Sequence, residues 1–244
     1  MTDILAKELL PTELDTPGIR ERISAEIRRR SFFSAKVGEA RILNRLRALC
    51  QRYADGTINI GDFTGQMQRY LDSIGYVPEG DGLKDLATER RLQLIARTQK
   101  RMADSLGRVA SQTASQVRRY PAWRLGRTGS RTKAREDWAA RWNAAGEACA
   151  WQGACRVDFV ALKSSPIWAE LGAGAGGFRD TIGNPYPPFA FGSGMGWLRV
   201  SADECRRLGL LPEEAEVPAL PDFAPTTGEI ADAERELAGF ELEI

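Results

Sequence analysis

Apolar residues in the first half of the chain recur mostly three to five positions apart, the spacing that places them on one face of an α-helix. This pattern predicts helices over residues 19–53 (with a bend or break at residues 31–34), 60–74 and 83–118. The last of these contains no proline, and Tyr120-Pro121 closes it. Residues 19–120 are therefore predicted to form a helical module, after a flexible leader at residues 1–18.

After Pro121 the pattern changes, because glycine and proline become frequent and all six tryptophans follow this residue. Trp138 and Trp142 are four residues apart, which places both on one side of a short predicted helix. The short elements that we predict are a helix over residues 133–145 capped by Gly146, a strand within 156–162 and a helical turn over 167–171. The predicted fold is mainly α with a small α+β C-terminal part: an N-terminal helical module, a compact module rich in tryptophan, glycine and proline over residues 121–210, and an acidic, partly disordered tail over residues 211–244.

Residues 180–200 are the most distinctive segment of the chain. The paired prolines at 187–188 impose extended or turn geometry, and Phe189 and Phe191 alternate with a small residue as on a short buried strand. We predict a rigid loop that inserts aromatic side chains into a core. The preceding glycine run, residues 172–177, is predicted to be a flexible connection, because no strand leads into it and no Lys-Ser/Thr follows it as in a phosphate-binding loop.

The net charge of +1 conceals an uneven distribution of charge. Residues 19–141 hold 26 basic and 13 acidic side chains, which gives +13, whereas residues 142–244 carry −9. No acidic residue occurs from Ser105 to Arg135. This density of basic residues can attract phosphate backbones through counterion release, or it can form a solvated face that pairs with the chain's own acidic tail. The candidate nucleic-acid-binding residues are Arg118, Arg119, Arg124, Arg127, Arg131, Lys133 and Arg135.

The chain contains no histidine, which excludes every catalytic triad or dyad that needs an imidazole and every metal site with a histidine ligand. The cysteines have no C-x-x-C spacing, so we predict free thiols in a reducing cytosol. They are Cys50, Cys149, Cys155 and Cys205. No apolar run has the length of a signal peptide or of a membrane span. We therefore expect no metal, no cofactor and no membrane partner.

A set of short motifs is spread over residues 19–210. It comprises Ser31-Phe32-Phe33-Ser34-Ala35, residues 94–103, Pro121-Ala122-Trp123, Asp137-Trp138 with Arg141-Trp142, residues 160–168, and Asp180 with residues 183–189. Together these motifs resemble the phage minor head proteins, or head morphogenesis proteins, of the Mu F type. The resemblance marks as its structural motif Trp138, Trp142, Asp180, Asn184, Pro187, Pro188 and Phe189.

The closing part of this resemblance departs from the usual family pattern. Typical members close with a segment like His-Pro-Pro-Asn-Cys-Arg-Cys, whereas this chain has residues 184–191 there, without histidine or paired cysteine. The chain thus resembles a divergent branch, and no metal or redox role carries over.

The resemblance implies a structural role in building the head of a tailed phage. Such proteins act with the portal in the host cytoplasm during assembly and then in the virion head, and some contact DNA. The partners that it implies are the portal or other head proteins and the DNA backbone. No catalytic residue and no small-molecule substrate are expected.

Two other interpretations stay open. A non-specific DNA-binding protein of a mobile element fits the basic segment, although the chain shows no helix-turn-helix with a recognisable tight turn. An enzyme or toxin-associated module would need paired carboxylates, for which Asp158, Glu170 and Asp180 are candidates without a pairing geometry in the sequence.

Overall fold

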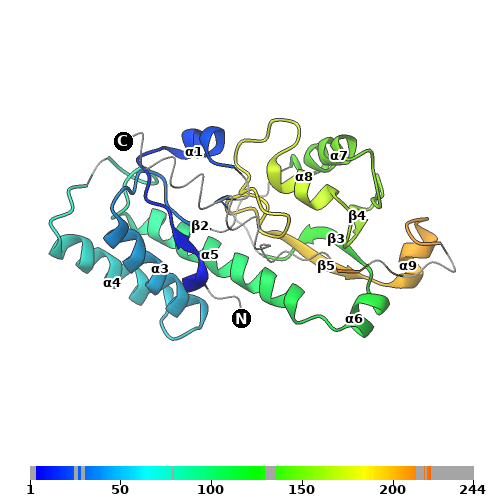
Figure 1. Cartoon of the computed structure of the whole chain (residues 1–244), viewed down its shortest axis with the longest axis horizontal. Helices are drawn as coiled ribbons and strands as arrows, with labels where there is room; N and C mark the ends of the chain where they lie inside the picture. The colour runs from blue at the N-terminus through cyan, green and yellow to red at the C-terminus, as the bar shows by residue number, and fades with distance from the viewer. Residues whose placement is uncertain are drawn as a thin grey trace. The chain divides into compact units, whose positions relative to one another are not determined.

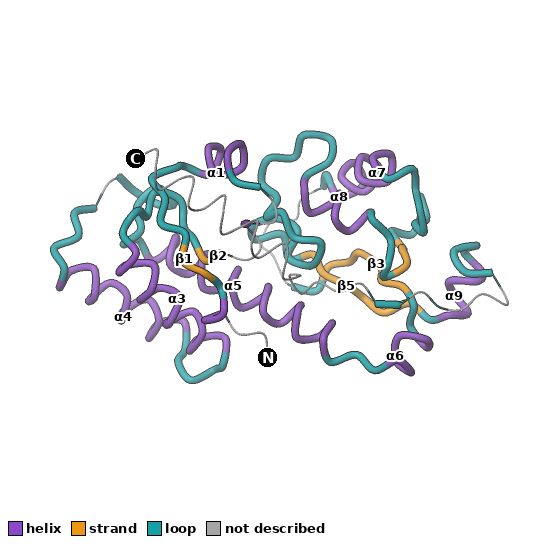
Figure 2. The backbone as a smooth tube through the Cα atoms, viewed as in Figure 1, coloured by secondary structure: helices purple, strands orange, loops and turns teal. Residues whose placement is uncertain are grey.

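The computed structural model describes residues 4–24, 27–28, 31–78, 80–129, 136–212, 217 and 219–220. The described part is mainly helical with two small sheets, which confirms the predicted mainly α fold class with a small α+β part (Figure 1, Figure 2). The described residues up to Asp104 form one compact unit, called unit 1, and those from Ser105 onward form a second, called unit 2.

The division between the units differs from the boundary predicted at residues 120–121. It falls within helix α5 (Glu89–Ala110), whose last turns belong to unit 2. Val109 on these turns is buried in the tryptophan-rich core of unit 2. The apolar contacts of the helix end, rather than the proline at position 121, therefore determine where the second unit begins.

Unit 1 consists of helices and one short pair of strands. Its elements are η1 (Ile4–Ala6), β1 (Glu8–Leu9), α1 (Thr16–Arg22), β2 (Ser31–Phe32), α3 (Ala40–Ala54), α4 (Ile60–Ser73) and most of α5. Strands β1 and β2 are parallel. The apolar sides of α3, α4 and α5 meet in a core that includes the fully buried Phe63 and Met67. Burial of these amphipathic faces is the main source of stability in such a unit.

The prediction for residues 60–74 is confirmed by α4, which Asn59 caps by accepting a hydrogen bond from the backbone N–H of Asp62 at 2.9 Å. The bend or break predicted at residues 31–34 within residues 19–53 is strand β2, which separates α1 from α3. Phe32 of that strand is fully buried, and its carbonyl accepts a hydrogen bond from Leu10. Burial of this aromatic ring and strand pairing outweigh the local helical periodicity.

The leader predicted at residues 1–18 contains ordered structure where it is described. Ile4 and Leu10 are buried, and the Thr12 N–H donates to the carbonyl of Val37. Asp15 caps α1 by accepting from the N–H of Gly18 at 2.9 Å. Apolar anchoring and backbone pairing thus hold this segment within unit 1.

The long helix predicted over residues 83–118 is two helices, α5 and α6 (Ala114–Arg119). The break between them has a local cause. The Thr113 hydroxyl accepts from the N–H of Gln116, and the Gln116 side chain accepts from the N–H of Thr113. This reciprocal capping box starts a new helix at position 114, which the hydrophobic spacing alone does not reveal.

Unit 2 combines a three-stranded antiparallel sheet with short helices. After the end of α5, its elements are α6, β3 (Ala122–Arg127), α7 (Trp138–Ala148), β4 (Val160–Leu162), α8 (Ile167–Ala173), β5 (Met195–Val200) and α9 (Ala202–Arg207). The strand order is β4-β3-β5. On the central strand, Trp123 and Leu125 belong to the aromatic core with α7 and α8. Ala122 faces the opposite way, into a smaller core with Cys205 of α9.

The short elements predicted for this half are confirmed in part. Helix α8 matches the predicted turn at 167–171, while α7 extends to Ala148, beyond the predicted cap at Gly146. Gly146 lies inside the helix rather than at its end. A side chain has no room there, because the ring of Trp151 lies 2.5 Å from the position a Cβ would take. The strand predicted within 156–162 begins only at Val160, since the two residues before it have positive φ.

The tail predicted to be acidic and partly disordered lies mostly outside the described residues. Leu211 is described, and it is buried beside Cys205 in the smaller core of unit 2. None of the helices that the structure describes is long and apolar enough to cross a membrane.

Candidate functional site

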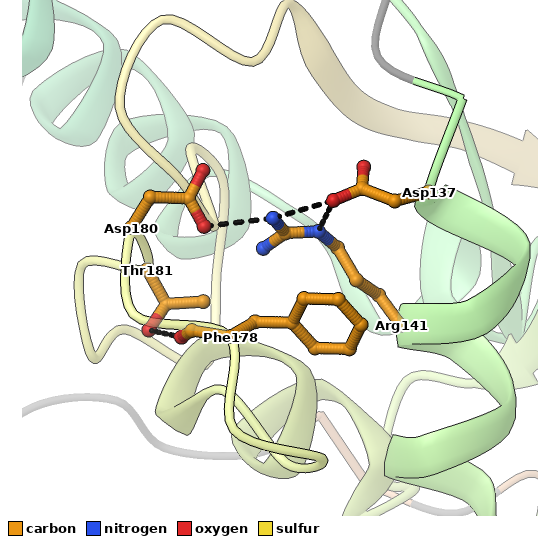
Figure 3. Close-up of polar contacts among 5 residues, drawn as sticks. All are labelled: Asp137, Arg141, Phe178, Asp180 and Thr181. Atoms are coloured by element: carbon orange, nitrogen blue, oxygen red, sulfur yellow. Dashed lines mark hydrogen bonds and ion pairs between the residues drawn. The ribbon is translucent and has the colours of Figure 1, made fainter.

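Arg141 is the centre of the most connected polar cluster in unit 2 (Figure 3). Asp137 precedes helix α7, and the spacing of four residues brings its carboxylate beside Arg141. The Arg141 Nε and Nη2 atoms donate to Oδ2 of Asp137 at 3.0 and 2.8 Å. Nη2 also donates to Oδ1 of Asp180 at 2.7 Å. A buried guanidinium therefore joins the start of α7 to the loop after α8, and we call these three residues the Arg141 cluster.

Aromatic rings enclose the guanidinium of this cluster. Its Cζ atom lies 4.3 Å from the centre of the Phe178 ring and 5.2 Å from that of Trp138. The Thr181 hydroxyl donates to the carbonyl of Phe178 at 3.2 Å, which fixes the turn that carries both Phe178 and Asp180 (Figure 3). Rings and carboxylates together offset the cost of burying this charge, while Nη1 of Arg141 is buried without a hydrogen-bond partner among the described residues.

The loop after α8 is packed closely against that helix. A Cβ at Gly172 would lie 1.8 Å from the carbonyl oxygen of Asn184, and the N–H of Gly183 donates to the carbonyl of Gly172 at 2.9 Å. Gly174 ends α8 with a φ of 86°, the left-handed conformation that glycine adopts at low cost. The glycine run at 172–177 thus forms a helix end and a close packing contact, rather than only the flexible connection predicted.

The predicted rigid loop that inserts aromatic side chains into the core is present. Phe189 is fully buried and stacks on Trp168, with ring centres 5.9 Å apart and planes at 17°. The peptide bond between Pro187 and Pro188 is cis, and both residues are buried. The strand expected around Phe189 is reduced to a single bridge between Thr181 and Ala190.

Tryptophans continue this packing into the sheet. The ring of Trp142 on α7 lies 5.5 Å from that of Trp168, edge to face. Trp123 of β3 and Trp197 of β5 stack at 3.6 Å with planes at 8°. The edge-to-face pair of Trp142 and Trp168 contributes beyond burial alone, whereas Trp123 and Trp197 stack almost directly face to face. Of the structural-motif residues of the resemblance, Trp138, Trp142 and Phe189 are therefore components of one aromatic core, and Asp180 belongs to the Arg141 cluster.

The structure does not gather the predicted nucleic-acid-binding residues into one site. Arg118 and Arg119 are exposed on α6, and Arg127 is exposed at the end of β3. Arg124 is engaged elsewhere: its Nη2 forms an ion pair with Glu204 of α9 at 2.6 Å, because it lies on the sheet face that packs against that helix. Three predicted members lie outside the described residues, namely Arg131, Lys133 and Arg135.

Sequence reasoning missed two basic residues that the fold places near α6. The guanidinium of Arg199 on β5 lies 5.7 Å from the centre of the Tyr120 ring, and that of Arg119 lies 5.5 Å from the same ring. Lys163 is buried, with its Nζ atom 5.4 Å from the centre of the Trp123 ring and donating to Oε1 of Gln112. A signal for Arg199 was absent from the sequence, because only the pairing of β5 with β3 brings it here.

Burial is the main cause of the altered titration of three groups. It lowers the pKa of Lys163 to about 8, and the charge of nearby Arg199 acts in the same direction. Burial raises the pKa of the Cys205 thiol to about 11 and that of the Cys50 thiol well above its ordinary range. All four cysteines are free thiols, as the sequence predicted.

The acidic residues considered for catalysis occupy different settings. Asp180 is bound by Arg141, Glu170 lies in the first turn of α8, and Asp158 is exposed in a turn with a φ of 64°. Within the described ranges, no three histidine, cysteine or acidic side chains are grouped so that they could hold a metal ion.

Comparison of the chain with protein families, with characterised proteins and with solved structures found no match.

Proposed function

We propose that this chain is a structural assembly protein of a tailed-phage or prophage head, a minor head protein that acts with the portal. It would work in the host cytoplasm during assembly and then in the virion head, without a cofactor. The proposal combines the resemblance of the sequence to the Mu F type with the way unit 2 uses the residues that carry it.

One observation carries the proposal: segments of the resemblance that are far apart in the second half of the chain pack into one body. Arg141 from the segment at residues 137–142 binds Asp180 from the last segment at 2.7 Å. Trp168 from the segment at residues 160–168 contacts Trp142 and Phe189. Motif residues that support one another in a core are typical of a scaffold module, whereas a catalytic motif places reactive groups beside an accessible substrate position.

The acidic residues favour the same interpretation over an enzyme. Asp180 is held by a buried cation, and Asp158 and Glu170 lie on a separate turn and a separate helix. A glycosidase-type mechanism would need two carboxylates at a fixed, short separation. Arg141 brings Asp137 and Asp180 close together, but both are ion-paired to that buried cation.

The test is to delete the gene from the phage or prophage genome that encodes it and to supply the chain from a plasmid. We expect the wild-type chain to sediment with purified heads and to restore infectious particles. Arg141→Met should reduce the amount found in heads, whereas Arg156→Met, which removes an exposed ion pair with Glu147, should not. Normal infectious particles in the deletion strain, with the supplied chain absent from heads, would refute the proposal.

A further inference from the structure

Exposed arginines from two parts of unit 2 gather around Tyr120, where α6 ends and β3 begins. Arg118 and Arg119 form the last turn of α6, and Arg199 comes from β5, where it is paired with Trp123. The guanidinium carbons of Arg119 and Arg199 lie 5.5 and 5.7 Å from the centre of the Tyr120 ring. We call Arg118, Arg119, Tyr120 and Arg199 the Tyr120 surface.

The arginines of this surface differ from several others in the same unit. Arg124, Arg156 and Arg206 form ion pairs with carboxylates at 2.6, 3.0 and 3.1 Å. No such pair joins Arg118, Arg119 or Arg199 to any acidic residue that the structure describes. Their charges are therefore free to meet an external anion.

Positive charge beneath the surface adds to this field. Lys163 lies against Trp123, the strand partner of Arg199, and the Arg199 charge contributes to lowering the pKa of Lys163. Cations so close together repel one another, and a polyanion would relieve that repulsion.

We propose that the Tyr120 surface binds the phosphate backbone of duplex DNA without reading its sequence. Planar guanidinium groups match phosphate oxygens in two-point hydrogen bonds, and the Tyr120 ring restrains two of them, which lowers the conformational entropy lost on binding. This inference rests on the proposed function, because a role in the phage head is what makes packaged DNA the natural ligand. It keeps Arg118 and Arg119 of the site predicted from the sequence and adds Arg199, because Arg124 is ion-paired to Glu204.

The experiment measures binding of the purified full chain to a short labelled duplex of random sequence by fluorescence anisotropy over a series of salt concentrations. The test variant replaces three arginines with glutamine, and the control variant removes the same charge from exposed arginines away from Tyr120. The test substitutions are Arg118→Gln, Arg119→Gln and Arg199→Gln, and the control substitutions are Arg156→Gln, Arg179→Gln and Arg207→Gln.

We expect the wild type to bind at low salt and the test variant to bind at least about tenfold more weakly. The logarithmic salt slope should flatten by about 0.9 for each phosphate that the variant no longer neutralises, while the control variant keeps most of the wild-type slope. Unchanged unfolding midpoints, followed by tryptophan fluorescence, establish that the variants are folded.

Three results would overturn the proposal: no binding by the wild type at low salt, equal weakening in the two variants, or displacement of the duplex by polyglutamate as readily as by unlabelled duplex. The last would indicate an acidic protein segment as the partner. Because the assay uses the purified chain, DNA binding can fail while incorporation into heads stands, and the reverse.

Discussion

Replacement of Arg141 should show how much the Arg141 cluster contributes to the stability of unit 2. Arg141→Met keeps apolar contact with Phe178 and Trp138 but leaves the Asp137 and Asp180 carboxylates facing one another. We expect the free energy of unfolding of unit 2 to fall by about 2–3 kcal/mol, somewhat less than for a fully buried pair because both carboxylates are partly exposed.

Urea unfolding followed by tryptophan fluorescence measures this change, because all six tryptophans lie in unit 2. Arg156→Met is the matched control: it breaks an exposed ion pair with Glu147 and should cost less than about 1 kcal/mol. Equal decreases in the two variants would show that Arg141 contributes no more than a surface charge.

Lys163 gives a prediction that depends on pH. The pKa of Lys163 is about 8 in the folded chain, whereas the ordinary value of 10.5 applies to the unfolded chain. Between these two pH values the unfolded chain therefore binds more protons than the folded one. Its contribution therefore makes the folded state more stable as pH rises through this range, and less stable below about pH 8. Lys163→Met removes the contribution.

The stability of the wild type relative to Lys163→Met should accordingly increase by about 1–3 kcal/mol from about pH 7 to about pH 9.5. Urea midpoints of both proteins at the two pH values test this, and titration of the other groups cancels in the difference. A difference that is the same at both values would contradict the lowered pKa.

Part of the candidate site was visible at the level of single residues. Asp137 and Arg141 are four residues apart within the helix predicted over residues 133–145, a spacing that favours an ion pair. Asp180 was marked by the resemblance and as a candidate acid, but its contact with Arg141 could not be predicted, since it spans 39 positions in the chain. Arg199 and Lys163 carried no local signal at all, because their surroundings are created by strand pairing and burial.

At the level of elements, helix α8 depends on one glycine. Gly172→Ala would place a Cβ 1.8 Å from the carbonyl oxygen of Asn184, a backbone atom that cannot move without displacing the loop. We expect a decrease of about 1–3 kcal/mol in the unfolding free energy of unit 2. Tryptophan fluorescence in urea measures it.

Gly65→Ala in α4 is the control for this substitution. Its Cβ would meet only the end of the flexible Arg69 side chain at 3.4 Å, so helix propensity should dominate and stabilise α4 by about 0.5–1 kcal/mol. Far-UV circular dichroism follows this change. A Gly172→Ala protein as stable as the wild type would show that the loop is not fixed by this contact.

Local chemistry decided which elements could be predicted. The helices α4 and α8 follow from apolar spacing and clear end signals, and both were confirmed. The strands β3 and β5 were not predicted, because each mixes tryptophan, arginine and glycine without regular alternation. Their register joins Ala122 to Val200, and no short-range signal specifies a pairing over that distance. The separation of α5 from α6 depended on one capping box.

For the whole molecule, the missing histidines predict an unusual insensitivity to pH. Histidine is the side chain whose ordinary pKa lies between about 5 and 8, and this chain has none. The groups nearest this interval are Lys7 and Lys163, whose pKa values burial lowers to about 8. As the pH rises above about 8, the two lysines make the folded state more stable, because the unfolded chain still holds their protons. The Cys50 and Cys205 thiols act in the opposite direction, because they stay protonated in the fold while they ionise in the unfolded chain.

We therefore expect the urea midpoint to stay nearly constant from about pH 6 to about pH 7, because in that interval both lysines keep most of their protons in the folded and in the unfolded chain. Changes should begin only on either side of it, from carboxylates in acid and from the opposing lysines and thiols in alkali. Equilibrium unfolding at closely spaced pH values, at constant ionic strength, measures the profile. A clear slope inside the interval would contradict this prediction. It would indicate a carboxyl group whose pKa the fold raises strongly, and that group would be a candidate functional site distinct from the Arg141 cluster.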